Sequence, residues 1–77
     1  MSEKILLRES VHQAINDYLQ KLDGQKPINL YNLVLKEVET PLLKAILKYT
    51  DNNQSIAAEI LGLSRTTLRK KIKLLLG

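Results

Sequence analysis

Hydrophobic positions along the chain recur at steps of three and four residues, which is the spacing of one face of an α-helix. A first apolar stripe of this kind covers residues 7–22 and ends before Gly24. A second stripe covers residues 30–49, with Asn29 as its predicted N-cap. No segment shows the alternation of apolar and polar residues that is typical of a strand. The pattern therefore predicts an all-α fold.

Pro41 lies inside the second stripe, where a proline removes one backbone donor and clashes with the preceding helical turn. The apolar spacing continues in phase through Leu42 and Ile46, which favours one kinked helix. The alternative is a pair of shorter helices that meet near Thr40, because the residue before a proline tends to leave the helical conformation.

Turn residues divide the last third of the chain. The cluster YTDNNQS at residues 49–55 predicts a turn and a helix start, and QSIAAEIL at residues 54–61 predicts a short helix. Gly62 ends that helix, Ser64 is a suitable N-cap, and residues 65–75 predict a terminal helix. Two short helices joined by a glycine turn have the outline of a helix-turn-helix.

The side chains of these two short helices suit such a corner. Ala57 and Ala58 are small where the helices must approach closely. On the terminal helix, Leu68 is expected at the centre of the buried face, with Ile72 one turn further on. The residues expected to point outward are then Thr66, Arg69, Lys70 and Lys73.

Charge is concentrated at the same end of the chain. The formal net charge is +4, of which residues 1–49 contribute only +1 from seven bases and six acids. Five Lys or Arg side chains, and no acid, lie between residues 65 and 73. A helix has the width to enter the major groove of DNA. We therefore expect an anionic partner at this helix, and duplex DNA is favoured over an acidic membrane surface.

The basic side chains differ in the contacts that they can make with DNA. Arg65 and Arg69 are the better candidates for contacting bases, because a guanidinium can donate two parallel hydrogen bonds to guanine. Lys70, Lys71 and Lys73 are assigned to phosphates, which they would hold as flexible point charges.

Polar residues at the starts of the two short helices complete the expected contact surface. Ser64 and Thr67 lie at the amino end of the terminal helix, where exposed backbone N–H groups and the helix dipole favour phosphate. Asn53 and Ser55 lie at the start of the preceding helix and are expected to hydrogen-bond the backbone of the same groove.

Other kinds of chemistry find little support in the composition. With no cysteine and one histidine, His12, we expect neither a disulfide nor a metal site. No nucleophile, base and orienting group converge, so we expect no enzyme activity, cofactor or small-molecule ligand. Glu37 and Glu39 are interpreted as an ordinary solvated pair. The chain lacks an apolar run suited to a signal peptide or a membrane span, which predicts a cytoplasmic protein.

The string NQSIAAEILGLSRTTLRKKIK at residues 53–73 resembles the DNA-binding motif of the Fis family of bacterial nucleoid-associated proteins, which is similar to the terminal domain of NtrC-type activators. The upstream segments resemble the same family, including the proline inside the second helix, so the resemblance covers roughly residues 6–73. It implies one four-helix domain over residues 1–77, with dimerisation helices at 7–50 and a helix-turn-helix at 53–73.

The resemblance also implies a function and a contact surface. It implies a homodimer in the nucleoid that binds and bends duplex DNA with little sequence preference and regulates transcription, with RNA polymerase as a further partner. The alternatives are an isolated DNA-binding domain of an NtrC-type activator and a helical dimerisation module with a basic surface. By position, the DNA contacts of the family fall on Asn53, Ser55, Ser64, Arg65, Thr67, Arg69, Lys70, Lys71 and Lys73.

Three departures limit what the resemblance implies. Ile56 and Leu74 stand where members of the family carry basic residues, which removes two potential contacts to the DNA backbone. The chain also begins almost at the first helix. We therefore do not expect the N-terminal hairpin arm with which family members stimulate DNA invertases.

Overall fold

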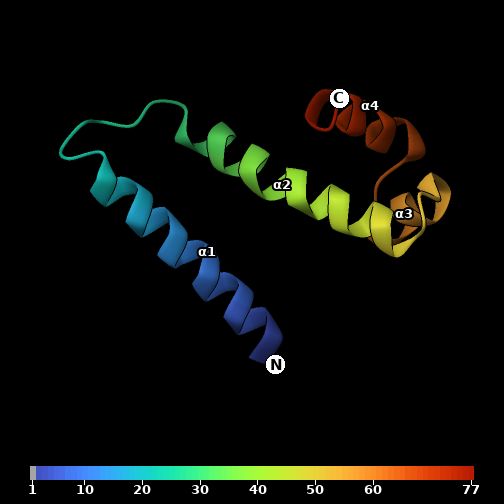
Figure 1. Ribbon diagram of the computed structural model, residues 1–77, viewed down its shortest axis with the longest axis horizontal. Coiled ribbons are helices and arrows are strands. Elements are labelled where there is room, and N and C mark those ends of the chain that lie inside the picture. The colour runs from blue at the N-terminus through green and yellow to red at the C-terminus, as the bar shows by residue number, and fades with distance from the viewer. Residues whose placement is uncertain (1) are drawn as a thin grey trace. The chain divides into compact units, whose positions relative to one another are not determined.

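The computed structural model describes residues 2–77, and its side chains from residue 6 onward. Over these residues it contains helices and no strand, which confirms the all-α prediction. No described helix has both the length and the apolar character needed to cross a membrane. The chain divides into two compact units, Met1–Leu30 and Tyr31–Gly77. The helices are α1 (Ser2–Lys21), α2 (Leu30–Tyr49), α3 (Gln54–Leu61) and α4 (Arg65–Leu75) (Figure 1).

The first unit consists of α1, the connection that follows it and Leu30, the first residue of α2. The helix begins at Ser2, earlier than the apolar stripe that predicted it, and ends before a left-handed turn in which Gly24 has a φ of 85°. Glycine adopts this conformation without the steric cost of a side chain. Several apolar side chains of α1 remain exposed, among them Leu7 at 69% and Tyr18 at 41%.

Helix α2 continues through Pro41, so the prediction of one helix is confirmed over the alternative of two. The proline cannot donate a backbone hydrogen bond to the carbonyl of Glu37, one helical turn before it. At the same turn, the hydroxyl of Thr40 donates to the carbonyl oxygen of Lys36 at 2.8 Å. Such a bond back to the preceding turn is often found where helices bend.

The predicted N-cap of α2 is wrong. Asn29 does precede the helix, but its φ is 57°, in the left-handed region, whereas an N-cap residue has extended backbone. Asparagine is one of the few residues other than glycine that tolerate the left-handed conformation. The connection therefore uses Asn29 to redirect the chain, a role that its residue type suits equally well.

The second unit has a small core where α2, α3 and α4 meet. Leu43 of α2, Ala57 and Ala58 of α3, and Leu68 of α4 are all at most 2% exposed. The central position predicted for Leu68 and the close approach at the two alanines are thus confirmed. Burial of a leucine side chain is worth about 1.5–3 kcal/mol, so this core holds the two short helices against α2. The partly buried residues packed around it are Ile46, Leu47, Leu61, Ile72, Leu75 and Leu76.

Candidate nucleic-acid interface

The turn between α3 and α4 is built on the predicted glycine. Gly62 has a φ of 76° and its N–H donates to the carbonyl of Glu59, while the N–H of Leu63 donates to the carbonyl of Ala58. These two bonds form a Schellman motif, which satisfies the last carbonyls of α3 and reverses the chain. A Cβ at Gly62 would meet nothing within 4 Å, so the backbone conformation, and not lack of space, calls for glycine here.

Two side chains cap the short helices at their amino ends. The Oδ1 atom of Asn53 accepts a hydrogen bond from the N–H of Ile56 at 3.1 Å, and the Oγ atom of Ser64 accepts one from the N–H of Thr67, also at 3.1 Å. The Ser64 hydroxyl in turn donates to Oγ1 of Thr67 at 2.9 Å. Because a hydroxyl both donates and accepts, Thr67 keeps its own hydrogen for an outside acceptor.

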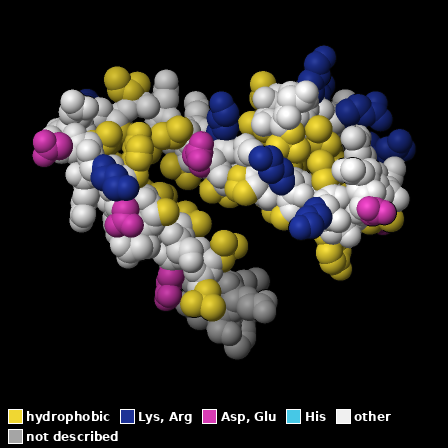
Figure 2. All heavy atoms as spheres, viewed as in Figure 1, with side chains coloured by type: hydrophobic (Ala, Val, Ile, Leu, Met, Phe, Trp, Pro, Cys, Tyr) yellow, Lys and Arg dark blue, Asp and Glu magenta, His cyan; other side chains and the backbone are white. Residues whose placement is uncertain are grey.

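Helix α4 has one buried face and one cationic face. Leu68 is fully buried at 0% exposure, whereas Arg65, Arg69, Lys70 and Lys73 are exposed. The outward directions predicted for Arg69, Lys70 and Lys73 are therefore confirmed. Figure 2 shows Lys and Arg side chains on the surface formed by α2 and α4.

The same unit carries the net charge of the protein. Residues 31–77 hold eight Lys or Arg and four Asp or Glu, which gives the whole formal charge of +4. Residues 1–30 hold four of each and are neutral overall. The positive potential that attracts a polyanion therefore arises from the unit that contains the helix-turn-helix.

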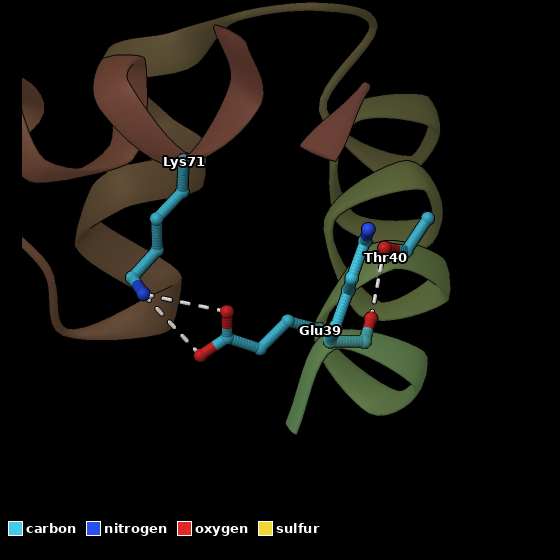
Figure 3. A network of polar contacts seen from close by, with 4 residues as sticks. Glu39, Thr40 and Lys71 are labelled. Atoms are coloured by element: carbon cyan, nitrogen blue, oxygen red, sulfur yellow. Dashed lines mark hydrogen bonds and ion pairs between the residues drawn. The ribbon is translucent and has the colours of Figure 1, made fainter. Parts of the chain in front are cut away.

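Lys71 is an exception among the predicted contact residues. Its Nζ atom lies 3.3 Å from both Oε1 and Oε2 of Glu39 on α2, and both side chains are about one-third exposed, at 34% and 32% (Figure 3). The structure thus directs Lys71 toward α2 and not outward with Lys70 and Lys73. The interpretation of Glu39 as a solvated acid is wrong for the same reason.

A signal for the direction of Lys71 was present in the sequence. Lys71 lies three residues after Leu68, and residues three apart on a helix share a face. Its partner could not be inferred in this way, because Glu39 precedes it by 32 residues and belongs to another helix.

The remaining predicted residues, Asn53 and Ser55, lie exposed at the start of α3. The cap uses only the side-chain oxygen of Asn53, so the side-chain N–H groups of this residue take no part in capping. The structure therefore exposes two kinds of donor: polar groups at the amino ends of α3 and α4, and cations along the outer face of α4.

Two short capped helices over a shared core, with a cationic outer face, define a helix-turn-helix protein. The chain matches the family described as "Bacterial regulatory protein, Fis family" over residues 34–74, and the "DNA-binding protein Fis N-terminal domain" over residues 6–27. The protein belongs to the Fis family. Because the match includes residues 6–27, it extends beyond the motif that resembles NtrC-type activators and favours Fis over that alternative.

Relatives named "DNA-binding protein Fis" are similar to most of this chain. Those from Psychromonas ingrahamii and Haemophilus influenzae are each 57% identical to it over 67 residues, and that from Glaesserella parasuis is 54% identical over the same length. Each of these matches covers 87% of this chain and 68% of the relative.

Proposed function

We propose that the protein binds double-stranded DNA by placing the exposed face of α4 in the major groove. The observation that carries this proposal is the contrast within one helix: Leu68 is fully buried, while Arg65 and Arg69 are exposed. An α-helix fits the major groove, and the second helix of a helix-turn-helix is the one that enters it. The relatives named "DNA-binding protein Fis" support the same function.

The contact residues divide into two roles under this proposal. Arg65 and Arg69 contact base edges, where a guanidinium can pair with guanine through two hydrogen bonds. Lys70 and Lys73 hold phosphates, together with the donors at the amino ends of α3 and α4. Phosphate contacts carry no sequence information. Because they make up a large share of the proposed DNA contacts, we expect binding to many different sequences.

We further infer that the protein acts as a homodimer through residues 7–50. Apolar side chains in this part of the chain are widely exposed, among them Tyr31 at 76%, Val38 at 42% and Leu42 at 44%. An uncovered apolar surface of this kind marks a contact with another macromolecule. A two-fold dimer would present two α4 helices to one face of the duplex, and bending would let both reach successive major grooves.

The biological role that fits these properties is that of a nucleoid-associated regulator. A dimer that binds many sequences and bends them serves both chromosome organisation in the bacterial cytoplasm and the control of transcription. RNA polymerase is the partner expected for the second of these activities.

A salt series tests the proposed DNA binding. The affinity of the purified protein for a labelled duplex would be measured by fluorescence anisotropy at several salt concentrations. We expect the logarithm of the binding constant to fall linearly with the logarithm of the salt concentration, with a slope of about −0.9 for each phosphate neutralised. A flat response would contradict binding through the cationic face of α4.

A further inference from the structure

The ion pair between Glu39 and Lys71 is a polar contact between two helices that are distant along the chain. The two residues are 32 positions apart, and both carboxylate oxygens of Glu39 lie at 3.3 Å from the ammonium of Lys71. The contacts that α4 makes with the shared core are apolar. Apolar packing is non-directional, whereas an ion pair has defined partner atoms, so this contact can select one orientation of α4 about its axis.

The orientation of α4 decides where its cations point. Side chains extend to about 5–6 Å from a helix axis, so a rotation of about 20° displaces a group at that radius by about 2 Å. A hydrogen bond to a base edge tolerates only a few tenths of an ångström. A contact that holds the rotation of α4 therefore controls whether Arg69 can form hydrogen bonds with a base.

The position of the pair on α2 also suits an anchoring role. Glu39 lies on the turn of α2 that contains Pro41 and the hydrogen bond from the Thr40 hydroxyl (Figure 3). On α4, Lys71 lies next to Ile72, which packs against the core. The ion pair is thus at the edge of the core, where its geometry is supported by the packed residues beside it.

We propose that Glu39 is a positioning residue for DNA binding: it holds Lys71 against α2 and so fixes the direction in which α4 presents Arg69 and Lys70. This inference rests on the DNA binding proposed above. Lys71 then pairs with α2 inside the protein's own fold and, unlike Lys70, does not neutralise a phosphate. The pair contributes little to overall stability, because ion pairs that stay partly exposed are weak.

Two double variants of identical net charge test the proposal. In Glu39→Lys/Lys71→Glu the charges of the pair are exchanged, so the contact can re-form between α2 and α4. In Glu39→Lys/Lys48→Glu the acid is moved to an exposed position of α2 outside the predicted DNA contacts, so Lys71 faces a like charge and the contact cannot re-form. We expect the exchanged pair to bind duplex DNA within about threefold of the parent, and the control to bind at least about tenfold more weakly.

A single substitution gives an independent test through the sign of its effect. Removal of an acid from a protein that binds DNA strengthens binding if only overall charge matters. We expect Glu39→Gln to weaken binding by about 3- to 10-fold, because α4 loses its fixed orientation. The matched control Glu37→Gln removes an exposed acid from the same helix and should not weaken binding.

The salt dependence of binding distinguishes a lysine paired within the protein from one that contacts a phosphate. We expect Lys71→Gln to leave the salt slope of binding unchanged, whereas Lys70→Gln reduces its magnitude by about 0.9. The single Gln variants keep this test available if an exchanged pair does not fold, and circular dichroism would establish folding for every variant.

Three results would overturn the positioning role while DNA binding by the parent stands: equal weakening in the two double variants, tighter binding by Glu39→Gln, or a reduced salt slope in Lys71→Gln. If the parent itself does not bind duplex DNA, the proposed function fails, and the role of Glu39 fails with it.

Discussion

Arg69 and Lys71 are two residues apart on α4 but have different surroundings. Arg69 is exposed, while Lys71 is partly covered and paired with Glu39. A helix turns through about 200° in two residues, so neighbouring cations of one basic run can serve different purposes. The number of basic residues in the run therefore overstates the number that can contact DNA.

Replacement of Arg69 tests its assignment to a base contact. Arg69→Ala should weaken duplex binding by about 1–3 kcal/mol, because two hydrogen bonds to a guanine are lost. The side chain is exposed, so the fold should persist. Anisotropy titrations against duplexes that differ at one base pair would measure both the affinity and the loss of discrimination between bases.

Lys70→Ala is the control for Arg69→Ala, and it should weaken binding equally for all sequences. An Arg69→Ala variant that binds like the parent would exclude the base contact.

Local signals decided how well each element was predicted. The bounds of α3 and α4 follow from Asn53, Gly62 and Ser64, because these residues act on the backbone within a few positions of themselves. The N-cap prediction for Asn29 was wrong because asparagine suits both an N-cap and a left-handed turn, and the residue type alone does not distinguish them. The pairing of Glu39 with Lys71 could not be predicted, because it depends on how α4 packs against α2 and leaves no local signal.

The two faces of α4 should respond differently to the same truncation. Leu68→Ala should destabilise the second unit by about 2–5 kcal/mol, because the side chain is fully buried and leaves a cavity. Leu74→Ala removes the same atoms from a side chain that is 81% exposed, and should change stability by less than about 0.5 kcal/mol. Urea unfolding followed by circular dichroism would measure both. Similar losses in the two variants would contradict the assigned buried face.

Across the described residues, exposed apolar side chains occur in both units, whereas the net charge lies in one. Residues 1–30 are neutral and expose Leu7, while residues 31–77 expose Tyr31 and carry the full charge of +4. Among the side chains that the structure describes, a core of four buried residues is also small for a chain of this length. Both features favour a stable form in which a second copy covers the exposed apolar positions.

Sedimentation equilibrium tests this dimer. A chain of 8.8 kDa should sediment with about twice that mass at micromolar concentration. Val38→Asp places a charge among the exposed apolar residues of α2 and should shift the mass toward the monomer, whereas Lys36→Asp on the same helix should not. A parent protein that sediments at 8.8 kDa would contradict the homodimer.

The most direct test of DNA binding through α4 is an NMR titration of the isotope-labelled protein with duplex DNA. We expect the largest chemical-shift changes at Arg65, Arg69 and Lys70 and at the amino end of α3, with the signals of α1 almost unchanged. Changes confined to α1 and the apolar residues of α2, with α4 unaffected, would contradict it.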